Sequence, residues 1–209
     1  MKATSDERVS AAAAAPALAA RLAALENRDT LRLAMCGSVD DGKSTLLGRL
    51  LAEAGMVPDD RLAQMIRDSK THGTQGGKPD YSLLLDGLEA ERQQGITIDV
   101  AWRYFGTDKR AFIVADCPGH AQYTRNMASG ASNAELGIVL VDARAGVQTQ
   151  TRRHIAILAM FGVQRVLFAV NKLDLIDYNH ARYHAIEQEC VKLAHDRGIA
   201  DADAIPVSA

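Results

Sequence analysis

The sequence contains 209 residues, of which 47% are hydrophobic, so the chain is long and apolar enough to bury the core of one domain. Its formal net charge of −2 provides no basic surface for nucleic acid and no polybasic patch for a membrane, so we expect neither as a partner. The three cysteines show no C-x-x-C spacing, which favours a reduced, cytoplasmic location.

The first 30 residues differ in composition from the rest of the chain. Residues 10–16 are rich in alanine, and the acidic Asp6 and Glu7 are atypical of a transit peptide. A short isolated helix in this region would be marginal in water. We therefore expect residues 1–30 to be a mobile leader and residues 31–209 to form the folded domain.

Strand-like and helix-like segments alternate from residue 31 onward. Apolar runs predict strands at 31–36, 98–105, 109–115, 136–141 and 166–170. Amphipathic spacing predicts helices at 44–54, 150–161 and 180–197. A short turn at 106–108 predicts that the second and third strands form an antiparallel hairpin. The pattern predicts a three-layer α/β sandwich with a mostly parallel sheet that binds ligands at the carboxyl ends of its strands. The glycine-rich stretch between the first strand and the first helix indicates that this sandwich is of the P-loop NTPase type.

The connection at residues 55–95 is long for a compact domain. It contains helix-like stretches at 58–69 and 83–94, separated by a glycine- and proline-bearing break at 73–79. Connections of this length usually carry function, so we expect this one to be a switch that faces a partner.

The stretch from Gly37 to Thr45 carries the strongest chemical signal. It satisfies G-x-x-x-x-G-K-[ST] between a predicted strand and a predicted helix, the setting in which backbone N–H groups surround phosphates. Lys43 is expected to reach the β- and γ-phosphates, and the Ser44 hydroxyl is expected to ligate magnesium. The predicted phosphate-binding residues are Gly37, Ser38, Val39, Asp40, Asp41, Gly42, Lys43, Ser44 and Thr45.

A second motif, Asp116-Cys117-Pro118-Gly119, follows the third predicted strand and satisfies D-x-x-G. Asp116 is expected to hold magnesium through a bound water, and the Gly119 N–H is expected to face the γ-phosphate. Thr97 would complete the magnesium shell when a γ-phosphate is present. The predicted metal ligands are therefore Ser44, Thr97 and Asp116.

His120 directly follows the D-x-x-G motif. A histidine at this point can orient the attacking water, as a glutamine does in other GTPases. The predicted catalytic residues are thus His120, Lys43 and Thr97. The other histidines show no metal-ligand pattern, and we expect them to be surface or packing residues: His72, His154, His180, His184 and His195.

A third motif, Asn171-Lys172-Leu173-Asp174, ends the strand at 166–170 and matches N-K-x-D. The Asp174 carboxylate can accept two hydrogen bonds, which suits N1–H and the exocyclic amine of guanine, whereas adenine offers no such pair of donors. Asn171, Lys172 and Asp174 are therefore predicted to bind the base, and GTP and GDP are predicted over ATP.

With these motifs in place, the chain resembles the translation-factor class of GTPases and, within it, the GTPase subunits of bacterial ATP sulfurylase. The resemblance covers residues 31–209. It rests on the phosphate loop, on 86–92, on 95–101 and on Tyr-Thr-Arg-Asn-Met at 123–127. Bacterial elongation factors usually carry His-Val-Asp-His where this chain has Ser-Val-Asp-Asp at 38–41.

The resemblance implies a two-protein enzyme. Its small catalytic subunit makes adenosine 5′-phosphosulfate from ATP and sulfate, and the GTPase subunit couples GTP hydrolysis to that reaction. In some bacteria the GTPase subunit is fused to adenylylsulfate kinase, and the resemblance leaves such a parent open. Ser208 and Ala209 match the Ser-Ala motif whose backbone contacts guanine O6 in this family. Ala121 stands where the family pattern has glutamate.

The resemblance also implies that a closing helix and two β-barrel domains follow the Ser-Ala motif. We therefore expect residues 31–209 to be a C-terminally truncated GTP-binding domain that does not make adenylylsulfate alone. Two other functions stay open at this point. One is an elongation factor-type GTPase that carries aminoacyl-tRNA, and the other is a nucleotide-binding module with vestigial hydrolysis, which His120 and Thr97 argue against.

Overall fold

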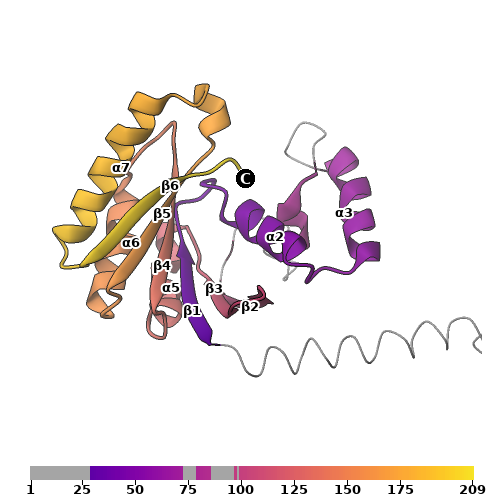
Figure 1. Cartoon of the computed structure of the whole chain (residues 1–209), viewed down its shortest axis with the longest axis horizontal. Helices are drawn as coiled ribbons and strands as arrows, with labels where there is room; N and C mark the ends of the chain where they lie inside the picture. Colours follow the sequence, from indigo (N-terminus) through magenta and orange to yellow (C-terminus); the bar gives the residue numbers. More distant parts are fainter. Residues whose placement is uncertain (1–28, 73–78, 86–96, 98) are drawn as a thin grey trace, which may run out of the picture.

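A six-stranded sheet organises the structure, a computed structural model that describes residues 29–72, 79–85, 97 and 99–209 (Figure 1). The strands are β1 (Thr30–Cys36), β2 (Ala101–Gly106), β3 (Ala111–Asp116), β4 (Leu136–Asp142), β5 (Arg165–Asn171) and β6 (Asp201–Pro206). Their order across the sheet is β2-β3-β1-β4-β5-β6. Only β2 and β3 pair in antiparallel fashion among the described strands, which confirms the predicted mostly parallel sheet with one hairpin.

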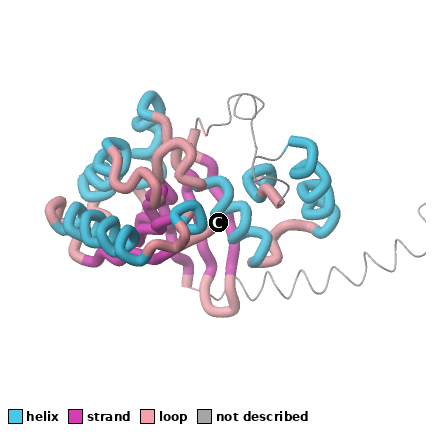
Figure 2. The backbone as a smooth tube through the Cα atoms, turned by 90° about the horizontal axis from the view of Figure 1, so that it is seen from above, coloured by secondary structure: helices cyan, strands magenta, loops and turns pink. Residues whose placement is uncertain are grey.

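Helices cover both faces of this sheet (Figure 2). The α-helices are α2 (Lys43–Glu53), α3 (Asp59–His72), α5 (Thr124–Ala131), α6 (Thr149–Met160) and α7 (His180–His195). Three short 3-10 helices are η1 (Tyr81–Leu84), η2 (Ala121–Tyr123) and η3 (Leu173–Ile176). The predicted three-layer arrangement is confirmed, since α2 packs on one face and α5, α6 and α7 pack on the other (Figure 1). No helix within the described ranges is long and apolar enough to cross a bilayer.

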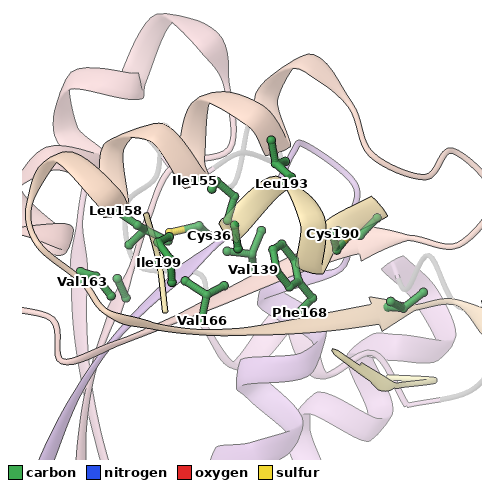
Figure 3. Packing of buried hydrophobic residues seen from close by; sticks show 14 of the residues in the cluster. Cys36, Val139, Ile155, Leu158, Val163, Val166, Phe168, Cys190, Leu193 and Ile199 are labelled. Carbon is green, nitrogen blue, oxygen red and sulfur yellow. The ribbon is translucent and has the colours of Figure 1, made fainter. Parts of the chain in front are cut away.

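Two apolar clusters fix these layers. The larger lies between the sheet and α5, α6 and α7, where Phe168 and Val139 meet Ile155 and Leu158 (Figure 3). The smaller lies under α2, where Leu47 packs with residues of the central strands. Because β4 and β5 are covered on both faces over much of their length, their sequences are almost continuously apolar.

The parallel register brings the carboxyl ends of the strands to one edge. Met35 in β1 lies beside Asp116 in β3, and Asp142 in β4 lies beside Asn171 in β5. The phosphate loop, the D-x-x-G motif and the N-K-x-D motif each begin at this edge. The sequence motifs are therefore neighbours because of the strand order, although more than 100 residues separate the first from the last.

The structure differs from the sequence-based expectations at several boundaries. Strand β2 begins at Ala101 rather than 98, and α7 ends at His195 rather than 197. The helix expected at 83–94 lies mostly outside the described residues, and its first two residues belong to η1, where the Asp80 side chain accepts a hydrogen bond from Ser82 N. Residues 86–94 lie outside the described residues, as do residues 1–28 of the expected leader and 73–78 of the expected break.

Candidate nucleotide-binding site

The phosphate loop runs from the end of β1 to the start of α2, as its sequence predicts. Asp40 and Gly42 both have positive φ angles, of 66° and 93°. Glycine suits position 42 for two reasons. A φ of 93° strains other residues, and a Cβ at this position would collide with the side-chain amide of Asn171. Local backbone shape and tertiary contact therefore both demand Gly42.

Lys43 is buried, and its amine folds back onto the loop. Its Nζ donates hydrogen bonds to the carbonyl oxygens of Gly37 at 3.0 Å and Ser38 at 2.8 Å. Burial lowers the pKa of Lys43, while the negative charges of Asp116 and Asp41 oppose that change. The lysine charge thus lies within the cradle where the sequence places phosphates.

The side chain of Asp41 bonds to the backbone of its own loop. Its Oδ2 accepts a 2.6 Å hydrogen bond from Ser38 N, and the side chain is buried. Burial raises the pKa of Asp41, against the lowering effects of the Ser38 bond and of Lys43. The side chain of Asp41 therefore braces the loop from inside, a role that the fixed positions of the motif do not reveal.

The D-x-x-G motif passes directly over the phosphate loop. A Cβ on Gly119 would lie 2.5 Å from Lys43 Nζ and 2.7 Å from Gly37 O, so the two loops touch only because this residue is glycine. Gln150 in α6 tethers the motif from outside by donating to Gly119 O at 3.3 Å. Asp116 and Cys117 are both buried beneath this crossing, and Pro118 lies between Cys117 and Gly119.

His120 follows this crossing and caps η2. Its Nδ1 accepts a 3.2 Å hydrogen bond from Gln122 N, so a neutral imidazole carries its proton on Nε2. The ring is partly exposed and lies 5.8 Å from the ring of Tyr123, measured between centroids. This ring therefore presents a donor, rather than an acceptor, to whatever approaches its Nε2.

Asn171 connects three parts of the site. Its Nδ2 donates to Asp41 O at 2.9 Å, and its Oδ1 accepts from Ala209 N at 3.1 Å. Ser208 Oγ donates to Asp174 Oδ1 at 2.8 Å. The structure thus brings the N-K-x-D residues, the phosphate loop and the final Ser-Ala pair together, as predicted from the motifs.

Asp142 is a site residue that motif matching left without a role. It is buried at the end of β4, and Lys172 Nζ lies 3.2 Å from its Oδ2. The lysine also donates a hydrogen bond to Asp40 O. The sequence did show an acidic residue at the end of a buried parallel strand, where ligands bind in such sheets. It did not show that this residue contacts Lys172.

Ser44 and Thr45 form the first turn of α2, and Val39 lies at the exposed tip of the loop. Thr97 is partly buried in an irregular segment between residues outside the described ranges. Within the described residues, no hydrogen bond connects Thr97 to the phosphate loop. Its predicted catalytic and metal-binding roles therefore stay predictions.

Comparison with known proteins defines the class of protein to which this fold and site belong. Residues 28–209 match the GTP-binding domain of elongation factor Tu, and the chain belongs to that family. The Saccharomyces cerevisiae Ski7 GTPase-like domain bound to GTP superposes with a TM-score of 0.73 at 19% identity, over 90% of this chain and 44% of that one. A bacterial selenocysteine-specific elongation factor gives a TM-score of 0.61 at 21% identity, over 86% and 26%. The predicted translation-factor-type fold is confirmed.

Sequence similarity narrows the class. Sulfate adenylyltransferase subunit 1 of Chromobacterium violaceum is 57% identical over 88% of this chain and 39% of its own length. The corresponding subunit of Francisella tularensis subsp. novicida is 55% identical over the same shares. The bifunctional enzyme CysN/CysC of Xylella fastidiosa is 58% identical over 88% of this chain and 30% of its own length. The resemblance stated from the motifs is confirmed, and the chain spans about two fifths of the length of the subunit 1 relatives.

Proposed function

We propose that the chain binds and hydrolyses GTP and couples this hydrolysis to the formation of adenosine 5′-phosphosulfate from ATP and sulfate by a separate small catalytic subunit. The proposal rests chiefly on the arrangement of Asn171, which ties the phosphate loop to the Ser-Ala pair beside Asp174. The names of the subunit 1 relatives support the sulfate-activating role. The partner acts on ATP and sulfate, whereas this chain acts on guanine nucleotide.

Base selection follows from the environment of Asp174. One of its carboxylate oxygens already accepts from Ser208, which fixes the orientation of the side chain. A fixed carboxylate offers acceptors to the two neighbouring donors of guanine and repels the acceptor that adenine presents there. The Ala209 N–H, held against Asn171, lies at the same end of the site.

The residues present suit a magnesium ion, which prefers hydroxyl and carboxylate oxygens together with phosphates and waters. Ser44 supplies a hydroxyl in the first turn of α2, and the buried carboxylate of Asp116 follows β3. In the described part of the chain, no cluster of three or more His, Cys, Asp or Glu side chains could hold a metal alone. When bound, magnesium would neutralise charge on the phosphates, held by Ser44, Asp116 and, with a γ-phosphate, Thr97.

The chain's own groups perform the remaining steps. Lys43 exchanges the carbonyls of Gly37 and Ser38 for phosphate oxygens, so a buried cation that is now bonded to the loop becomes bonded to the ligand. The amide groups at the start of α2 face the same charge. His120 holds the attacking water through Nε2–H, and Gly119 contributes its N–H beside it.

Two measurements test this function. Titration with GTP, GDP and ATP in magnesium should give tight binding of both guanine nucleotides and at least about 100-fold weaker binding of ATP. Equal affinity for ATP and GTP would remove the base assignment. A binding assay with purified sulfate adenylyltransferase small subunit and with aminoacyl-tRNA then separates the two coupled functions, since retention of tRNA alone would favour a translation factor.

A further inference from the structure

At the end of β4, the buried carboxylate of Asp142 bonds to two cations, a partly buried lysine and a half-exposed arginine. Arg144 binds both oxygens of Asp142, with its NH2 2.6 Å from Oδ2 and its Nε 3.0 Å from Oδ1, and its backbone N–H donates to Oδ1 at 2.9 Å. Lys172 Nζ lies 3.2 Å from the same Oδ2. The side chain of Asp142 is 7% exposed, whereas those of Lys172 and Arg144 are 24% and 51% exposed.

The two residues joined by the hydrogen bond from Lys172 to Asp40 both have a strained backbone conformation. Lys172 has a φ of 61°, and Asp40, whose carbonyl accepts the hydrogen bond from Lys172 Nζ, has a φ of 66°. Non-glycine residues adopt this left-handed conformation at a cost, so the surrounding contacts must hold it. The bonds that Lys172 makes to Asp40 and Asp142 are the side-chain contacts available to do so.

We propose that Asp142 is a positioning residue of the nucleotide site that acts through Lys172 and slows the release of guanine nucleotide, and that Arg144 is the surface cation that fixes Asp142. This inference rests on the proposed nucleotide site. Asp142 lies beside Asn171 in the sheet register, and its side chain reaches the base motif at Lys172, which bonds to the phosphate loop. Loosening Lys172 therefore leaves the bond from Asn171 to Asp41 O as the remaining described side-chain link between the loop and the base-binding segment.

Asp142 stays ionised near neutral pH. Burial alone would raise the pKa of Asp142, but hydrogen bonds from Arg144, together with Lys172, lower it to about 2. Other acidic groups surround this network: the charges of Lys172 and Asp142 act on Asp41, and the charges of Asp174 and Asp40 act on Arg144. Asp142 therefore accepts charge-assisted bonds throughout the neutral pH range, and Arg144 is accessible at the surface.

A double-mutant cycle tests whether Asp142 acts through Lys172. The rate of release of mant-labelled GDP, chased by unlabelled GDP, is measured for the parent, Asp142→Asn, Lys172→Ala and the double variant. Each single change should speed release by about 10-fold, since each removes a charge-assisted bond from a partly buried pair. The double variant should release GDP at the rate of Lys172→Ala alone, within about twofold. Multiplied effects, near 100-fold in the double variant, would overturn the proposal.

Arg144 provides a second test that spares the core. Arg144→Ala should speed GDP release by about threefold in the parent and should have no effect when Lys172 is already alanine. An equal effect in both backgrounds, or none in the parent, would contradict its role. Glu189→Gln is the matched control, because it removes a 2.6 Å ion pair with Arg152 on the α6–α7 surface and should leave release unchanged. If the parent itself fails to bind GDP, the proposed function fails; if it binds and the cycle is additive, only this inference fails.

Discussion

The hydroxyl of Ser208 donates a 2.8 Å hydrogen bond to Oδ1 of Asp174, across 34 positions of sequence. One residue later, Ala209 N donates to Asn171 Oδ1. These two bonds join the turn after β6 to the N-K-x-D motif after β5. The carboxylate that we propose to select the base is therefore oriented by the segment after β6 rather than by its own loop.

Asp174→Asn should exchange base preference. The new amide would place a donor where guanine also donates, so we expect GTP affinity to fall roughly 100-fold. Xanthine nucleotides carry a carbonyl in place of the exocyclic amine and should bind this variant better than GTP. Competition between XTP and GTP for the variant measures this exchange, and unchanged preference for GTP would contradict the assigned role of Asp174.

His120→Ala should separate binding from hydrolysis. Loss of one water-positioning group should lower single-turnover hydrolysis by about 10- to 1,000-fold, while the Lys43 and Asp174 contacts keep GTP affinity nearly unchanged. Lys43→Ala serves as the contrast, because it removes charge facing the phosphates and should weaken binding itself. A variant at position 120 that hydrolyses at the parent's rate, with saturating GTP and the small subunit present, would leave the histidine without a catalytic role.

Gly48→Ala should destabilise the fold. Gly48 lies in α2, where a Cβ would collide with the main-chain carbonyl of Tyr81 in η1. Backbone cannot turn aside as a flexible side chain can, so we expect a loss of about 1–3 kcal/mol in the free energy of unfolding. Helix propensity alone predicts the opposite, a gain of roughly 0.5–1 kcal/mol. Urea titration of both proteins decides between the two signs.

Acidification should destabilise the protein through His154. This side chain is wholly buried in α6, and neither ring nitrogen has a hydrogen-bond partner within the described residues. Burial, with smaller contributions from Lys43 and Arg153, lowers its pKa from 6.5 to about 4. Below pH 6.5, His154 is therefore protonated in the unfolded chain but stays neutral in the folded chain. As a result, the free energy of unfolding falls as the pH drops toward 4.

The size of this effect is about 2 kcal/mol by pH 5. His154→Gln removes the titrating group, so the parent should lose about 2 kcal/mol more than this variant between pH 7.5 and pH 5 in urea titrations. Taking the difference between the two proteins cancels the contributions of the acidic groups that both retain. Parallel pH profiles for parent and variant would show that His154 takes up a proton without unfolding.

The thiols should be inert in the folded state. Cys36, Cys117 and Cys190 are all buried. A hydrogen bond with the Cys36 thiol, followed by burial, raises the pKa of Cys117, and burial raises the pKa of Cys190 to about 12. Since the thiolate is the reactive form, DTNB at pH 8 should label none of the three natively and all of them in guanidinium. Rapid native labelling of any one would contradict the burial of that thiol.

The sequence predicted the layers, the hairpin and the meeting of the three motifs because each depends on local pattern and on the rule that parallel strands end at one edge. The surroundings of Lys172 could not be predicted in this way. Asp142 acquires its role because the β4–β5 register places it beside Asn171, and register is a tertiary property. His154, expected to be a surface or packing residue, is a packing residue in the core. The lack of hydrogen-bond partners for its ring nitrogens within the described residues depends on tertiary structure and could not be predicted.

The segment at 55–95 shows a different limit of sequence reasoning. Its first predicted helix exists as α3, and most of the second lies outside the described residues. The sequence did not predict η1, whose start depends on the side chain of Asp80. Ser69 in α3 in turn accepts a hydrogen bond from Asp80 N at 2.8 Å. Periodicity describes helices that pack through one apolar face, whereas a single cap and one tertiary bond decided this turn.

The placement of Ser208 and Ala209 has a consequence for how the protein folds. The phosphate loop lies between β1 and α2, which are neighbours in the sequence. The carboxylate of Asp174 is oriented only after β6 has paired with β5 and the Ser208 hydroxyl has reached it, across 34 positions of sequence. We therefore expect a folding intermediate in which β6 is still unpaired to bind phosphate but to discriminate poorly between guanine and adenine, so that base selection is acquired in a separate, later folding step.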